Sequence, residues 1–332
     1  MQSLPSFKRT AVTLLAMLLG SASLAAGDAL TLVPEDATTV AMVRVSDLRT
    51  SPITARLFEE TDRLSVDGDA ARFLAETGLE PAKDLDRIIV ATRPGSDKEP
   101  NVLVAFEGRF DRNRIEEALA ARGAVRKTSE HGLYFLLPES DDERPAIAFI
   151  DSSFGVAGSE ASVVQALAAH AGGGTGFMSR SGLGREISRV ERGATSWLLV
   201  DVQRAARHHG GPDWSDATKG RAGLLGPAMK TVAVLALWAT DSGDALRFGG
   251  TAVSYDAETR QLLEDLLRGV LSGWRLAVQE KKPELLPVLR KFRVEQTSDA
   301  VIFTGSLPAD VVKNWEAKKR SVARHALGEG AP

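Results

Sequence analysis

Two adjacent histidines and two nearby aspartates form the densest group of possible metal ligands in the chain. His208 and His209 precede Asp213 and Asp216 in the stretch HHGGPDWSD. Imidazole and carboxylate groups bind divalent transition metals, and a glycine-rich loop could fold all four around one ion. A solvated polar loop accounts for the same residues, because adjacent histidines in an extended backbone diverge. The group is therefore a candidate divalent metal site, and the sequence indicates no other cofactor.

A run of acidic residues is the second place where chemistry could occur. Glu139, Asp141, Asp142 and Glu143 lie together in PESDDERP. Two carboxylates can divide the acid and nucleophile roles of a glycosidase. Contiguous charges usually face water, however, and this run is typical of a solvated turn between two strands.

The sequence lacks the common catalytic motifs. It contains no G-x-S-x-G elbow, no H-E-x-x-H, no Walker A pattern, no EF-hand loop and no complete G-x-G-x-x-G. Gly182 and Gly184 begin like a dinucleotide fingerprint, but Ile187 occupies the third glycine position. These observations favour a non-catalytic binding or scaffolding module, and no catalytic residue can be named. The alternative is a hydrolase whose site is assembled from sequence-distant residues, with the His208/His209 loop as a metal site.

The N-terminus predicts export. Lys8 and Arg9 precede the apolar run 11–20, and small residues follow it up to Ala25 and Ala26. This is the pattern of a secretory signal peptide over residues 1–26, with cleavage near Ala25 or Ala26. The apolar run is too short to cross a bilayer, which takes about 20 residues. We therefore expect a bacterial envelope protein, periplasmic or secreted, that is soluble after cleavage and has no transmembrane span.

Composition and charge narrow the partners. The chain has no cysteine, which removes disulfides, thiolate metal sites and a lipoprotein anchor together. The net charge of −3 provides no basic field for nucleic acid. The C-terminal stretch does carry a group of cations that could contact an anionic membrane surface, although cations near a helix C-terminus also complement the helix dipole. These cations are Lys318, Lys319, Arg320 and Arg324. An envelope protein or ligand is the expected partner, and the sequence does not identify it.

An internal duplication is the main sign of organisation. Residues 88–119 are predicted to form strand, turn, strand and helix, and residues 234–267 repeat that order. The chain is thus divided into two related α+β repeats, 27–171 and 177–332, the second ending in a C-terminal helix. The glycine-rich stretch 172–176 is the predicted linker between them.

The links between neighbouring strands indicate antiparallel pairing. Residues 93–100 and 241–244 are too short for parallel crossovers and are rich in turn-forming residues. Asp111 is expected to cap a helix that ends at Gly123, and a longer helix should run from Ala257 to about residue 279. The predicted fold class is therefore α+β, with two tandem halves. Each half is an antiparallel sheet with helices on one face, and the halves either pack together or share one sheet.

The two ends of the mature chain resemble a group of proteins. The stretch TLVPEDATTVAMVRVSDLRTSPI (31–53) is similar to the opening of uncharacterised exported bacterial proteins, in which a P-x-D-A segment leads into the first strand. FRVEQTSDAVIFTGSLPADVV (292–312) is similar to their final strand, which ends in Leu-Pro before a helix. The resemblance implies a duplicated α+β envelope protein and carries no catalytic residues across.

Overall fold

Twelve strands are found in the part of the chain that the structure describes. The structure is a computed structural model and describes residues 28–54, 68–94, 101–138, 145–172, 176–177, 182–209 and 231–313. The strands up to residue 159 are β1 (Thr39–Arg44), β2 (Leu85–Arg93), β3 (Asn101–Gly108), β4 (Val125–Ser129), β5 (Gly132–Leu136), β6 (Pro145–Phe149) and β7 (Phe154–Ser159). The later strands are β8 (Ser196–Asp201), β9 (Val234–Asp241), β10 (Ala245–Val253), β11 (Arg293–Gln296) and β12 (Ala300–Pro308).

The helices between these strands vary widely in length. Those up to residue 171 are η1 (Ala29–Leu32), α2 (Val45–Thr50), α4 (Gly68–Thr77), α5 (Pro81–Asp84), α6 (Arg112–Ala121) and α7 (Glu160–Ala171). The later ones are η3 (Gly182–Arg189), α8 (Val202–His209), α11 (Ala257–Lys281), η5 (Pro283–Leu285) and α12 (Leu286–Leu289). No helix within the described residues has the length and apolarity needed to span a membrane.

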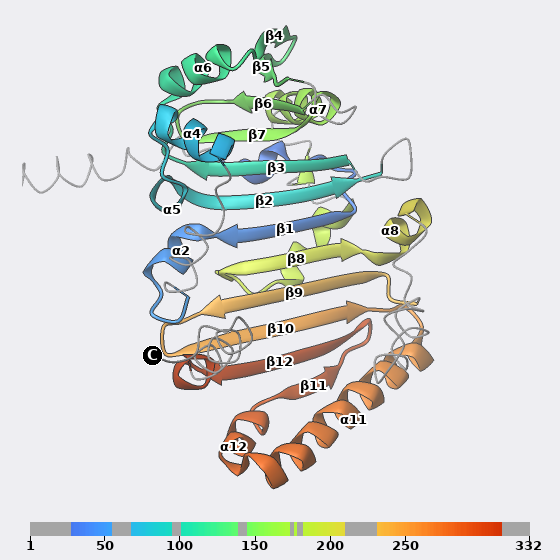
Figure 1. Cartoon of the computed structure of the whole chain (residues 1–332). Helices are drawn as coiled ribbons and strands as arrows, with labels where there is room; N and C mark the ends of the chain where they lie inside the picture. The colour runs from blue at the N-terminus through green and yellow to red at the C-terminus, as the bar shows by residue number, and fades with distance from the viewer. Residues whose placement is uncertain are drawn as a thin grey trace, which may run out of the picture.

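All twelve strands belong to one sheet, in the order β11-β12-β10-β9-β8-β1-β2-β3-β7-β6-β5-β4. The neighbouring strands pair antiparallel throughout, including the short-linked pairs β2–β3 and β9–β10. In Figure 1 the strands run side by side from β4 at one end to β11 at the other, where α11 crosses. The predicted antiparallel α+β fold is confirmed.

The two segments that were expected to form separate halves meet at the centre of the sheet. β1 pairs with β8, and Met42 lies opposite Trp197 in their register. Of the two arrangements expected from the sequence, the continuous sheet is therefore the one found. A run of three antiparallel strands followed by a helix occurs on each side of this pair, as β1–β2–β3–α6 and β8–β9–β10–α11. Descent of the two runs from one ancestral unit remains a prediction.

Helices lie against both faces of the sheet rather than one. On β3, Leu103 packs in the cluster that contains Val163 of α7, whereas Phe106 packs with Ile115 of α6 on the opposite face. β12 behaves likewise, because Val301 packs against α11 while its neighbour Ala300 belongs to the first cluster. Strands that carry apolar residues at successive positions need cover on both sides, and this explains why the expectation of a single helical face was too narrow.

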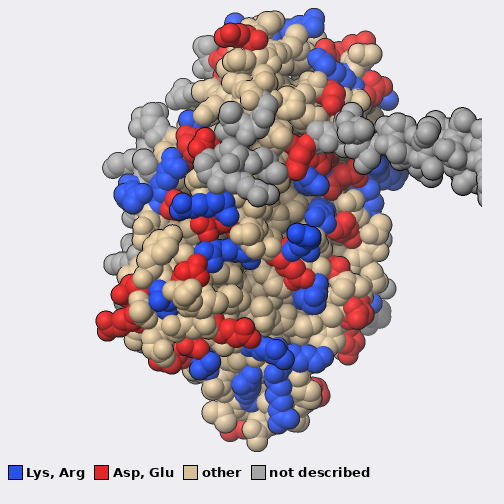
Figure 2. Space-filling model, turned by 180° about the vertical axis from the view of Figure 1, so that it is seen from behind, with Lys and Arg blue, Asp and Glu red and all other residues tan. Residues whose placement is uncertain are grey.

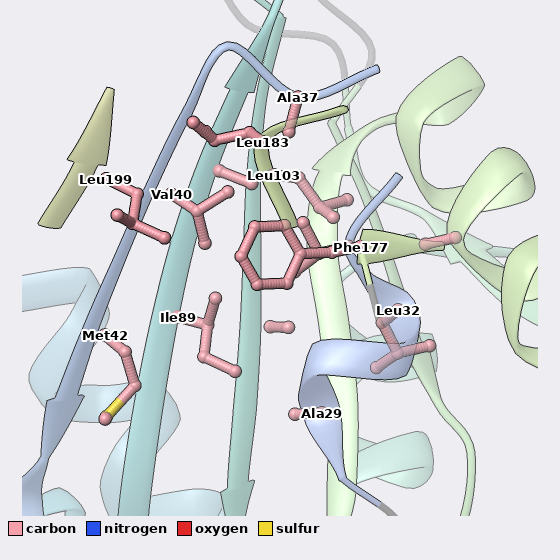
Figure 3. Packing of buried hydrophobic residues seen from close by; sticks show 14 of the residues in the cluster. Ala29, Leu32, Ala37, Val40, Met42, Ile89, Leu103, Phe177, Leu183 and Leu199 are labelled. Carbon is pink, nitrogen blue, oxygen red and sulfur yellow. The ribbon is translucent and has the colours of Figure 1, made fainter. Parts of the chain in front are cut away.

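Phe177, which follows the predicted linker, is a central residue of the main core. Its side chain is 1% exposed, and its backbone N–H donates to Val33 O at 2.8 Å. Figure 3 shows the ring among residues of η1, β1, β2 and β3. Gly176 makes this close approach feasible, because a Cβ there would lie 2.5 Å from Val33 O. The chain is thus held against the core immediately after the glycine-rich stretch.

Several sequence predictions lie outside the described residues. These are the signal peptide (1–26), the acidic run at 139–143, most of the linker (173–175) and the cations from Lys318 to Arg324. They stay predictions.

Candidate functional site

Two of the four predicted metal ligands lie at the end of a helix. His208 and His209 are the last two residues of α8, and Asp213 and Asp216 lie outside the described residues. Among the residues that the structure does describe, no group of three or more His, Asp or Glu side chains is placed to hold a metal ion. The four-residue metal site therefore remains an untested prediction.

His170 packs among residues of neighbouring elements. His170 Nδ1 lies 3.1 Å from Thr31 Oγ1, and its ring meets Phe154 edge-on at a centroid distance of 5.3 Å. These contacts join α7 to η1 and β7. They account for His170 without a catalytic role.

The most distinctive cavity lies between α11, α12 and the end of the sheet formed by β10 and β12. Its volume is about 460 Å³, and all ten residues that line it are hydrophobic. Small-molecule sites commonly occupy about 300–1,000 Å³ and include a few polar groups. A cavity of this size without a polar side chain suits an aliphatic or aromatic ligand and offers no group for acid, base or nucleophilic chemistry.

The sequence of α11 explains how the cavity forms. Asp256 caps the helix by accepting from Thr259 N at 2.6 Å, and the helix continues for 25 residues. Leu263 packs in a cluster with Val294 of β11 and Val301 of β12. Leu271 packs in a cluster with residues of α12 and with Phe292 and Phe303. One turn further, Trp274 and Val278 line the cavity instead.

Three phenylalanine rings line the cavity on the side of the sheet. Phe248 of β10, Phe292 before β11 and Phe303 of β12 have centroid separations of 5.4 to 6.0 Å. Rings at these distances and angles pack against one another in edge-on or tilted pairs. The opposite wall is held by Arg275, which donates to Leu289 O and Phe292 O at 3.1 and 3.2 Å.

The outer surface around the cavity is partly apolar and partly cationic. Val270, Trp274 and Leu276 of α11 are 41%, 52% and 67% exposed. Figure 2 shows Lys and Arg side chains gathered at the lower end of the molecule, where α12 and β11 lie. Arg290, Lys291 and Arg293 belong to that stretch. An apolar surface beside cations is the pattern of a protein surface that meets an anionic lipid interface.

Sequence reasoning missed this cavity. The leucine pattern of α11 was visible, and so were the isolated phenylalanines at 248, 292 and 303. Nothing local indicated that α11 would extend past the sheet and leave a space beneath it. The space forms because α12 packs beside α11 before the chain enters β11, and that packing is a tertiary contact.

The described part of the chain is an α+β protein whose twelve strands form one antiparallel sheet, with an apolar, ligand-sized space under α11. No protein-family model matches the sequence, and no curated protein matches it. Among solved structures, crystal form III of TP0453 is similar with a TM-score of 0.50 and 12% identity, covering 86% of this chain and 96% of that chain. Crystal form I of TP0453 matches with a TM-score of 0.48 and the same 12% identity, over 87% and 96% of the two chains. At such identity the likeness concerns the fold.

Proposed function

We propose that the chain is an exported, non-catalytic binding module of the bacterial envelope that holds the aliphatic chain of a lipid in the cavity beneath α11. The observation that carries this proposal is the wholly hydrophobic lining of a space of about 460 Å³. Water in such a space would find no hydrogen-bond partner, so an apolar ligand is favoured over solvent. The signal-peptide pattern of residues 1–26 supports the location.

The apolar surface of α11 and the cations near α12 support a lipid as the source of that chain. Trp274 both lines the cavity and is half exposed, so it connects the interior to the surface. Arg290 and Lys291 are exposed at the same end of the molecule. A fatty-acid carboxylate or an anionic headgroup could stay near these cations while the hydrocarbon enters the cavity.

Fatty-acid binding by matched variants tests the proposal. The purified mature chain is titrated with a dansyl-labelled undecanoic acid, which is then displaced with palmitate. Val278→Arg places a charge on the cavity lining, whereas Val125→Arg makes the same substitution on the exposed edge strand β4, at the other end of the sheet. We expect Val278→Arg to weaken binding by at least about tenfold, because a charge would be transferred beside a purely apolar wall. Val125→Arg should bind like the wild type.

Three outcomes would overturn the assignment. Equal affinity of wild type and Val278→Arg would place the ligand elsewhere. A wild-type dimer that dissociates in Val278→Arg would assign the cavity to a second copy of the chain. Conversion of the lipid or of an ester probe, rather than its recovery intact, would favour the hydrolase alternative. The export component is tested separately by N-terminal sequencing of envelope-fraction protein, which should begin at Ala26 or Gly27.

A further inference from the structure

A second cavity lies on the opposite face of the sheet from α11, and its character is different. It has a volume of about 480 Å³ and lies between η1, the segment after η3 and the central strands. Its apolar floor is formed by Met42 and Trp197, which are opposite each other on β1 and β8. Trp197 is buried and stacks on Phe177 with an interplanar angle of 13°, so the floor is part of the main core.

Three arginines line this cavity. Arg44 and Arg87 are directly opposite on β1 and β2, and Arg192 follows η3. Like charges placed opposite each other on neighbouring strands are unfavourable unless acids neutralise them. The ion pairs that the nearby acids form therefore determine how much positive charge remains in the cavity.

The acids at the cavity are committed to other partners. Asp28 Oδ1 and Glu107 Oε1 each accept from Arg87 Nη1 at 3.0 Å. Glu191 pairs with Arg247. Arg87 is thus paired with two carboxylates, and Glu191 is paired with a residue of β10 rather than with an arginine of the cavity.

Arg44 and Arg192 remain incompletely paired. Arg44 Nη1 has long contacts, 3.4 Å to Gly193 O and 3.8 Å to Asp47 Oδ2. Arg44 Nε is buried and has no hydrogen-bond partner within the described residues. Arg192 is exposed and has no hydrogen bond or ion pair in that same part of the chain. An anion in the cavity would give the terminal nitrogens of both guanidinium groups the acceptors that they lack.

We propose that this cavity is a binding site for a small amphiphilic anion. Arg44 and Arg192 would bind its carboxylate or phosphate group, and its apolar part would lie on Met42 and Trp197. Guanidinium groups suit this task, because they bind carboxylate and phosphate through paired hydrogen bonds and stay charged at every physiological pH. The site is independent of the cavity beneath α11 and takes a different ligand class, one in which the anionic group is bound directly by two arginines.

Calorimetric titration with three probes and four variants tests the proposal. The probes are octanoate, inorganic phosphate and 1-octanol, titrated into the full mature chain. Octanoate should bind more tightly than phosphate or octanol, because it alone has both the charge and the hydrocarbon. Preferential binding of phosphate would overturn the amphiphilic part, and equal binding of octanol would overturn the role of the arginines.

The variants assign the binding to this cavity. Arg44→Gln and Arg192→Gln should each weaken octanoate binding by about tenfold or more, the size expected for losing a charge-assisted hydrogen bond. Arg126→Gln, on the exposed edge strand β4, is the matched control and should change nothing. Val278→Arg should also leave this binding intact, even where it abolishes palmitate uptake. Octanoate binding that survives Arg44→Gln and is lost in Val278→Arg would overturn the site and assign the ligand to the α11 cavity.

Discussion

Arg44 and Arg87 lie opposite each other in the register of β1 and β2, on the face of the sheet that also carries the buried Met42. Arg87 has two carboxylate partners at 3.0 Å, whereas the nearest carboxylate to Arg44 is 3.8 Å away. The pair is therefore asymmetric, with one guanidinium neutralised and the other left with most of its charge. A residue that costs stability in this way is typical of binding sites, where function and stability compete.

The first prediction concerns the stability cost of Arg44. Arg44→Gln should raise the free energy of unfolding by about 0.5 kcal/mol, because it removes the buried Nε donor that has no acceptor among the described residues. Arg44→Lys also removes that donor and should gain about as much. Urea unfolding of the wild type and both variants measures the effect. Lower stability of both variants than of the wild type would show that Arg44 is a structural residue.

The second prediction concerns the core position that follows the linker. Phe177→Ala should lower the free energy of unfolding by about 3–5 kcal/mol, because a fully buried ring would be replaced by a cavity at the centre of the main cluster. Leu262→Ala, at a site that is 57% exposed on α11, should change it by less than about 0.5 kcal/mol. Chemical denaturation of the two variants gives the comparison. A small effect at Phe177 would mean that the residues around it close the gap.

Local patterns in the sequence were sufficient for many elements of this fold. Alternating apolar residues predict strands at 39–45 and 101–107, and β1 and β3 end within one residue of these bounds. Asp111 accepts from Arg114 N as the expected N-cap of α6, and Gly123 has the positive φ of 83° that a helix-terminating glycine adopts. α11 begins at Ala257 as predicted. Caps and periodicity are properties of short segments, so they could be read without the tertiary structure.

Features that depend on distant contacts could not be predicted in the same way. β4 was missed because it is a polar edge strand with four of its five residues exposed, which removes the apolar alternation. The leucines at 262, 263, 266, 267 and 271 predict one apolar stripe that faces the sheet. Leu262 is nevertheless 57% exposed, because it lies about 100° around the helix from the buried Leu263. The pairing of β1 with β8 brings Met42 to Trp197. No local signal specifies that contact, and both cavities depend on contacts of this kind.

The third prediction concerns the guanidinium that holds α12 to α11. Arg275→Ala should lower the free energy of unfolding by about 1–2 kcal/mol, because the carbonyls of Leu289 and Phe292 would lose their donor. Arg275→Lys should recover little, since a single ammonium cannot reproduce the fork that reaches both carbonyls. Gln261→Ala on the same helix removes an exposed i,i+4 hydrogen bond to Asp265 and should cost about 0.5 kcal/mol or less. Thermal unfolding ranks the three variants. Full recovery by lysine would mean that the charge, and not the fork geometry, holds α12 in place.

The last prediction concerns pH and two carboxyl groups whose pKa values are shifted in opposite directions. Burial raises the pKa of Glu107, and the hydrogen bond from Ala29 N and the charge of Arg87 offset this only in part. Between the unfolded value near 4.3 and the raised native value, the native state binds more protons than the unfolded chain, so the contribution of Glu107 to stability falls as pH rises. The hydrogen bond from Arg189 lowers the pKa of Asp299, so the stabilisation from Asp299 is present above its unfolded value near 3.9 and is lost as pH falls. The free energies of unfolding of the wild type, Glu107→Gln and Asp299→Asn are measured from acidic to neutral pH. As pH increases, the stability of the wild type should fall relative to Glu107→Gln and rise relative to Asp299→Asn. Slopes of the same sign would contradict the burial of Glu107 as the dominant influence on that carboxyl group.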